Sequence, residues 1–244
     1  MILDLFFPRG RCMACSIPRP DSADGICDVC RNKLAELTVP PESCDICLSY
    51  VPANKPCPFC AEGGMAGIDR MYAPYRYVGP VRELVHLLKF GHEERAADLL
   101  AEKMADSLMD REFDMIIPVP LHRYRKRERG YNQSALLARR VSQRTGIPVN
   151  ETFLTRPRAT KAQSSLKHSD RAANVEKAFS ANEGVRGKRI LLLDDVRTSG
   201  ATARACAAAL REQEAAKVCL LTAALVWTWG ARKQENDQKE DPRS

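Results

Sequence analysis

The segment with the most chemical content joins an apolar run to two carboxylates and then to a turn rich in hydroxyl groups. It reads ILLLDDVRTSGAT over residues 190–202. We expect a buried parallel strand that opens into a helix, because backbone N–H groups and hydroxyls at a helix N-terminus bind a phosphate dianion. Asp194 and Asp195 would repel that phosphate, so their expected targets are the hydroxyls of a sugar or a magnesium ion beside it.

A second segment places cations directly after an apolar strand. It reads PVPLHRYRKRERGYNQ over residues 118–133. Residues 121–171 carry a local net charge of +10, which exceeds the +7 of the whole chain. An anionic partner is therefore expected, and the phosphates of a small molecule or of a nucleic acid fit equally well at this point. The alternative is a solvated basic surface without a ligand.

The cysteines suggest metal binding, because eight of the ten form four C-x-x-C pairs within the first sixty residues. They are Cys12, Cys15, Cys27, Cys30, Cys44, Cys47, Cys57 and Cys60. Two such pairs complete a tetrahedral site, so eight thiolates predict two structural zinc ions. The gaps of 11 and 9 residues between paired motifs are short for a zinc ribbon. Grouping in sequence order is favoured, with a cross-braced arrangement left open.

Competing interpretations of the cysteines are weaker. A disulfide framework needs an oxidising compartment. Residues 1–7 are interrupted by Asp4 and lack a basic leader, which argues against secretion and favours a cytoplasmic protein without a membrane anchor. Four copies of C-x-x-C without a thioredoxin-like setting argue against a redox-active motif. Cys206 and Cys219 are expected to be small core residues.

The elements that position these segments alternate between strands and helices after residue 69. We expect strands at 71–78, 115–119, 189–193 and 217–226, and helices at 81–90, 93–108, 133–145 and 201–213. This alternation predicts an α/β fold with a parallel sheet covered on both faces. Residues 155–182 are expected to form a long loop with some extended structure. The expected domains are 1–62, 69–228 and a disordered polar tail at 229–244.

Residues 190–202 resemble the phosphoribosyl pyrophosphate motif of type I phosphoribosyltransferases, an apolar strand followed by D-D-x-x-T-[ST]-G-x-T. With the N-terminal cysteines, the PVPL segment and the T-x-x-Q…R-x-x-N-V segment from residue 160 onward, the chain resembles the ComF family of competence-associated proteins, also called ComF/GntX. The resemblance implies a type I phosphoribosyltransferase domain, which is a Rossmann-like parallel sheet with helices on both faces. It also implies that a double zinc ribbon precedes that domain.

The resemblance further implies roles for particular residues. The acidic pair would bind the ribose hydroxyls, the following turn would cradle the 5-phosphate, PVPL would form the pyrophosphate loop, and a mobile loop would cover the site. The residues are Asp194 and Asp195; Val196, Arg197, Thr198, Ser199, Gly200, Ala201 and Thr202; Pro118, Val119, Pro120, Arg123, Arg125, Arg127 and Arg129; and Gln163, Arg171 and Asn174. Arg197 occupies a variable position of the motif.

The expected function is binding of Mg²⁺-phosphoribosyl pyrophosphate, with transfer to an acceptor nitrogen if the protein is an enzyme. The ComF resemblance implies a role in DNA uptake during natural transformation. The alternative is a non-catalytic accessory of DNA uptake that binds single-stranded DNA at the same basic site and contacts other DNA-uptake proteins. No residue identifies the acceptor.

Overall fold

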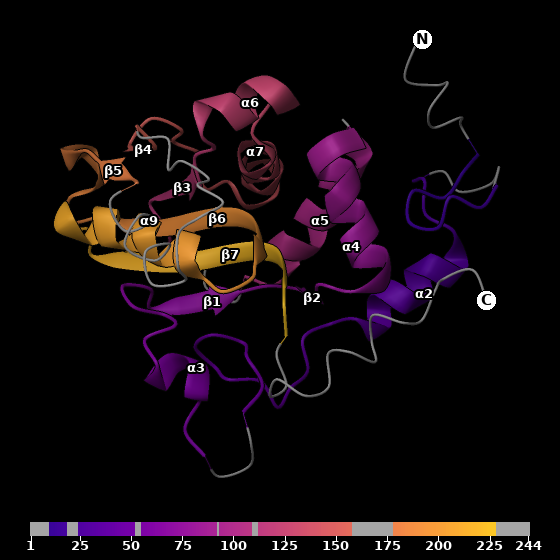
Figure 1. Ribbon diagram of the computed structural model, residues 1–244, viewed down its shortest axis with the longest axis horizontal. Coiled ribbons are helices and arrows are strands. Elements are labelled where there is room, and N and C mark those ends of the chain that lie inside the picture. Colours follow the sequence, from indigo (N-terminus) through magenta and orange to yellow (C-terminus); the bar gives the residue numbers. More distant parts are fainter. Residues whose placement is uncertain are drawn as a thin grey trace, which may run out of the picture.

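The computed structural model describes residues 10–18, 24–51, 55–91, 93–108, 112–157 and 178–227. Figure 1 shows their helices and strands. In chain order these elements are α2 (Asp28–Glu36), α3 (Pro58–Ala61), β1 (Arg70–Tyr72), β2 (Tyr75–Arg76), α4 (Gly79–His86), the π-helix η1 (Leu87–Gly91), α5 (Glu94–Asp106), β3 (Met115–Pro118), α6 (Arg123–Arg129), α7 (Gln133–Thr145), β4 (Leu154–Thr155), β5 (Ser180–Ala181), η2 (Glu183–Val185), β6 (Arg189–Arg197), α9 (Ala201–Glu212) and β7 (Lys217–Leu225).

The centre of the protein is a parallel sheet. Among the described residues its strand order is β1-β7-β6-β3, and β2 pairs with β7 beyond β1. Every pairing in this sheet is parallel. The strands are short runs of apolar residues, as expected for a sheet that is buried on both faces. A separate antiparallel pair joins β4 to β5.

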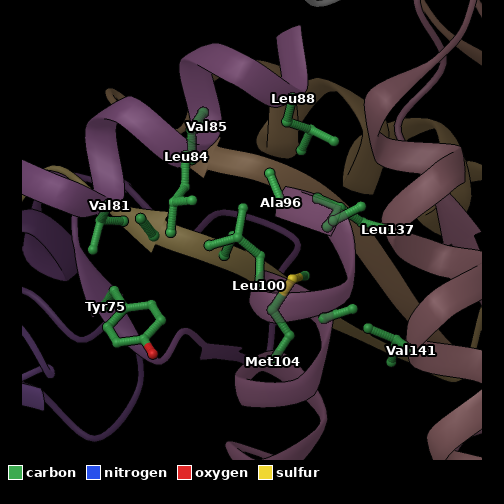
Figure 2. Close-up of a cluster of buried hydrophobic side chains, with 14 of the residues drawn as sticks. Tyr75, Val81, Leu84, Val85, Leu88, Ala96, Leu100, Met104, Leu137 and Val141 are labelled. Carbon is green, nitrogen blue, oxygen red and sulfur yellow. The ribbon is translucent and has the colours of Figure 1, made fainter. Parts of the chain in front are cut away.

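Alternate residues of each strand enter different cores. In β6, Leu191 and Leu193 pack with α4, α5 and α7, whereas Ile190 and Leu192 pack with α9 on the opposite face. Figure 2 shows the first of these cores, in which Leu84, Leu100 and Leu137 meet over the sheet. Helices therefore cover both faces, which confirms the expected fold class.

Each cysteine segment joins one of the two cores. Cys12, Cys27 and Cys30 belong to the core that contains α4 and α5. Cys47 belongs to the core under α9. Figure 1 shows α2 close to α4, and α3 at a separate place beneath the sheet. The N-terminal region is thus packed along the α/β unit at two points.

Several expected elements differ in detail. The strand expected at 71–78 divides into β1 and β2 around Pro74, which has no N–H to donate to a ladder. The helix expected at 81–90 begins as α4 and ends as the π-helix η1. β6 continues four residues past Leu193, because Asp194, Val196 and Arg197 still pair with β7.

The basic segment after PVPL is helical, which corrects its interpretation as a loop. α6 begins after His122, whose Nδ1 accepts from the Tyr124 backbone N–H, and ends at Gly130 with φ +80°. Arginine, lysine and glutamate are good helix formers, so this charged segment favours a short helix. The helix of 133–145 is confirmed as α7.

Two expectations fall outside the described residues. The tail at 229–244 is one, and the mobile-loop residues Gln163, Arg171 and Asn174 are the other. None of the described helices combines the length and apolar character needed to cross a bilayer.

Candidate functional site

The candidate ligand site lies at the carboxyl ends of β3 and β6. There β6 carries the acidic pair into the turn before α9, and β3 leads into the PVPL segment. The two strands are neighbours, with Pro118 opposite Leu193 and the Val119 N–H donating to Leu193 O at 2.8 Å. Ligands of open α/β sheets bind at this edge. The fold therefore brings two of the predicted segments together.

The acidic pair is held by partners from two other elements. Ser134 Oγ, in the first turn of α7, donates to Asp194 Oδ1 at 2.8 Å. Lys89 Nζ, from η1, lies 2.7 Å from Asp195 Oδ2. Asp195 is only 5% exposed, and this ion pair with Lys89 neutralises its charge within the protein. Both carboxylates are thus fixed in place before any ligand binds.

The electrostatics of the pair favour one negative charge over two. Burial raises the pKa of Asp194 to about 7, and the charge of Asp195 adds to this rise, while the hydrogen bond from Ser134 opposes it. Two adjacent carboxylates repel each other when both are ionised. A cation or a set of hydroxyl donors would relieve this repulsion, which is the chemistry expected of a magnesium-bound sugar.

The turn after the acidic pair has the conformation expected of an anion cradle. Gly200 has φ +74°, in the left-handed region that favours glycine, and it directly precedes the twelve residues of α9. Thr198 and Ser199 are exposed, and residues 198–202 line a small hollow together with Asp194 and Thr222. Backbone N–H groups at the start of α9 face this region because helix N-termini leave them unpaired.

Lys89 and Ser134 are site residues that the sequence reasoning missed. Lys89 lies more than 100 positions before Asp195, and Ser134 lies 60 positions before Asp194. The available signals were weak: a single lysine at the end of a helical pattern, and a serine one position after the Gly-Tyr-Asn-Gln run. The π-helix that presents Lys89 is a conformation often found at functional sites.

The PVPL segment is tied to α7. Asn132, the N-cap of α7, donates from Nδ2 to Val119 O at 3.0 Å and accepts from the Ser134 N–H. Pro118 and Val119 are buried, and Pro120 is half-buried. This arrangement fixes the backbone of the expected pyrophosphate loop beside the acidic pair.

The four expected arginines of this segment are not equivalent. Arg129 is half-buried, donates from Nη1 to Gln133 Oε1 at 2.7 Å, and stacks over Phe90 with Cζ 5.0 Å from the ring centroid. It therefore lies beside η1 and the start of α7. Arg123, Arg125 and Arg127 are exposed on α6.

The cysteines form two groups of four in sequence order, as favoured. Cys12, Cys15, Cys27 and Cys30 make one group; Cys44, Cys47, Cys57 and Cys60 make the other. Within each group, all sulfurs lie within 4.8 Å of one another. The cross-braced alternative does not occur. Cys206 and Cys219 are fully buried core residues outside both groups, as expected.

The sulfur distances fit zinc. A tetrahedron with Zn–S bonds of about 2.3 Å has sulfurs about 3.8 Å apart. The Sγ–Sγ distance is 3.9 Å for Cys15–Cys27 and for Cys44–Cys60, and 3.4 Å for Cys47–Cys57. Four sulfur ligands complete the coordination of each ion, so such zinc would be structural and would supply no reaction chemistry.

One thiol of the first group is already prepared for a metal. Burial would raise the pKa of Cys12, but hydrogen bonds from the backbone of Cys27, Cys15 and Ala14 outweigh it and lower the pKa to about 7. The Cys27 N–H donates to Cys12 Sγ at 3.4 Å. A thiolate is the form that binds zinc, so these hydrogen bonds favour the metal-binding form of Cys12.

Comparison with known proteins agrees with these features. Residues 91–243 match the family described as "Phosphoribosyl transferase domain". The chain is 31% identical over 216 residues to the DNA utilization protein YhgH of Salmonella typhimurium, which covers 86% of this chain and 94% of that protein. It is 27% identical over 222 residues to Competence protein F of Haemophilus influenzae, covering 83% and 91% respectively.

Among solved structures, similarity is found to the glutamine phosphoribosylpyrophosphate amidotransferase from B. subtilis, with 26% identity and a TM-score of 0.38. That match covers 52% of this chain and 26% of the amidotransferase chain. The sequence relatives, in contrast, are matched over nearly their whole length. Cysteine groups, sheet and relatives together show that the chain belongs to the ComF family of competence proteins, which carry a phosphoribosyltransferase-type domain.

Proposed function

We propose that this protein binds Mg²⁺-phosphoribosyl pyrophosphate at the carboxyl edge of its sheet. The observation that carries the proposal is the joint geometry of β6 and α9, in which a preoriented acidic pair adjoins a hydroxyl-rich turn at a helix N-terminus. Carboxylates accept hydrogen bonds from ribose hydroxyls, and the turn offers donors to a terminal phosphate. Asp194 and residues 198–202 line the same hollow of the protein, which supports the proposal.

Each group then has a defined task. Asp194 and Asp195 hold the ribose hydroxyls, and residues 198–202 hold the 5-phosphate. Lys89 and Arg129 lie on the side of the acidic pair formed by η1 and α7, so they are placed to attract the pyrophosphate. Magnesium, when bound with the ligand, would neutralise the pyrophosphate charge through hard oxygen ligands.

The transfer that this site would support is a substitution at C1 of the ribose. An acceptor nitrogen forms a bond to C1 as the C1–O bond to pyrophosphate breaks, pyrophosphate leaves with that electron pair, and the acceptor loses a proton to solvent. The chain's contribution is to hold the two reactants in line and to stabilise the departing charge. The competence relatives support a role in DNA uptake, and we propose that the protein itself is cytoplasmic.

Thermal unfolding tests the binding proposal directly. Phosphoribosyl pyrophosphate should raise the Tm of the wild-type protein only when magnesium is present, because a ligand selective for the folded state stabilises it. At one hundred times Kd, the gain is about 2.7 kcal/mol. Asp194→Asn combined with Asp195→Asn should remove the shift. An equal shift in the double variant would mean that the ligand binds elsewhere.

A second function is favoured by the aromatic residues of the basic surface. Tyr124 on α6 is 61% exposed and lies beneath the guanidinium of Arg123, while Phe90 is 62% exposed beside Arg129. Exposed aromatic rings next to cations are the elements that hold single-stranded nucleic acids, by stacking on bases and neutralising phosphates. We therefore propose that α6 and η1 also present a surface for single-stranded DNA.

A further inference from the structure

A buried arginine joins the second cysteine group to the turn that follows the acidic pair. Arg197 is the last residue of β6, directly before Thr198, and is only 3% exposed. Arginine is rarely buried to this degree unless its charge is matched by a partner. Because Arg197 lies inside the phosphate motif, whatever holds its side chain also affects the turn that follows.

The contacts of the guanidinium come from the second cysteine group and from residues next to its cysteines in the sequence. Arg197 Nη2 donates to Cys47 O at 3.1 Å and to Ser49 Oγ at 3.0 Å. Arg197 Cζ lies 4.7 Å from the ring centroid of Phe59, which stands between Cys57 and Cys60 in the sequence. The side chain thus leaves the phosphate motif and ends among residues that surround the candidate zinc site.

The charges at this contact are complementary. Zinc held by four thiolates carries a net charge of −2. A loaded second site would therefore supply the counter-charge that a buried guanidinium requires.

The turn at residues 198–200 also contacts the region around the second cysteine group. A side chain at Gly200 would lie 3.3 Å from Gly64 O and 3.4 Å from Phe59 Cζ, so the backbone of the turn closely approaches the segment after Cys60. Arg204 Nη1 donates to Ser199 O at 3.1 Å and to Gly64 O at 3.4 Å. The first cysteine group instead packs in the core on the opposite face of the sheet.

We propose that Arg197 is a positioning residue through which metal at the second cysteine group holds the phosphate turn in its binding conformation. When Cys44, Cys47, Cys57 and Cys60 hold zinc, Arg197 is locked between Cys47 O and Phe59, and residues 198–200 are ordered. Loss of this metal releases the guanidinium and loosens the turn. The effect on affinity rests on the proposed function, whereas the effect on the order of the turn does not.

The test uses the full-length, zinc-loaded protein and two arginine variants. Arg197→Met keeps an unbranched side chain, shorter than that of arginine, without charge or hydrogen bonds. Arg211→Met is the matched control, because Arg211 ties α9 to the segment before β1 through Gly67 O and Asp69 but lies at the other end of the helix. Titration calorimetry with phosphoribosyl pyrophosphate and magnesium should show a loss of at least about tenfold for Arg197→Met and less than about twofold for Arg211→Met.

Hydrogen exchange of the ligand-free protein provides the second readout. The amides of residues 198–202 should exchange faster in Arg197→Met and in Cys57→Ser/Cys60→Ser, which removes the second metal. They should keep the wild-type rate in Cys12→Ser/Cys15→Ser, which removes the first. If Arg197→Met does not fold, the comparison of the two double cysteine variants still tests the proposal.

The outcomes separate the two proposals. If wild-type protein fails to bind phosphoribosyl pyrophosphate, the proposed function is wrong. The role of Arg197 is then tested by the hydrogen-exchange rates alone. Equal exchange at 198–202 after loss of either metal overturns the inference. So does wild-type affinity in a folded Arg197→Met variant.

Discussion

At the scale of single residues, the main feature is a pair of adjacent carboxylates in different surroundings. Asp195 is matched by the ammonium group of Lys89, and Asp194 by the hydroxyl of Ser134. A neutral hydroxyl compensates a charge less than an ammonium group does. The ionisation of Asp194 responds to pH near neutrality, since burial raises its pKa to about 7.

This pKa predicts a pH dependence of ligand binding. The ribose hydroxyls donate to the ionised form of Asp194, whereas protonation is favoured in the free protein below about pH 7. Affinity for phosphoribosyl pyrophosphate should therefore fall as pH falls, by about tenfold between pH 8 and pH 6. Calorimetry on wild type and Asp194→Asn measures this. The ligand's own phosphates titrate in both proteins, so only the difference between the two profiles reports Asp194, and identical profiles would falsify the assignment.

Sequence reasoning identified the residues that are contiguous in the motif and missed those that join it from elsewhere. Asp194, Asp195 and the turn before α9 were found because a strand, two acids and a hydroxyl-rich turn follow one another. Lys89 reaches the site only because β6 lies next to η1 in space. Arg197 was grouped with the phosphate residues, and only the packing of Phe59 and Cys47 shows where its side chain ends.

At the scale of elements, α6 changes how the basic segment can work. A loop could align its five cations along one strand of DNA, but a helix distributes them around its axis. Residues spaced three or four apart share a helix face, which places Arg123, Lys126 and Arg127 together. Arg125 and Arg129 form another such pair, and Arg129 is already engaged by Gln133 and Phe90.

Salt-dependent binding of single-stranded DNA tests this arrangement. Each phosphate contact contributes about 0.7 to the slope of log K against log salt concentration. Lys126→Ala with Arg127→Ala should lower the slope by about 1.4 if both residues contact phosphates. Tyr124→Ala should weaken binding by about 1–3 kcal/mol and leave the slope unchanged, because stacking releases no counterions. Absence of salt-dependent binding by wild type at low ionic strength would remove the nucleic-acid proposal.

At the scale of the whole molecule, the cysteine groups are built into the two cores of the α/β unit. Tyr72 and Leu100 share one core with Cys30, and Leu192 and Cys206 share the other with Cys47. The parallel sheet and its covering helices could be predicted because their apolar runs alternate in the sequence. The sharing of cores could not be predicted, because it depends on which faces of the sheet the two cysteine segments cover. The boundaries at 62 and 69 remain predictions.

Shared cores predict that metal removal weakens the whole protein. Cys44→Ser should lower the zinc content from two ions to one, and it should also lower the single Tm by roughly 5–10 °C, since a loss of 1 kcal/mol shifts Tm by about 2–4 °C at this chain length. Cys206→Ala is the control, because it alters a core cysteine and should keep both ions. Elemental analysis and calorimetry measure the two effects. If the ribbons were independent, Cys44→Ser would instead leave the main transition in place, and a separate small transition would be lost.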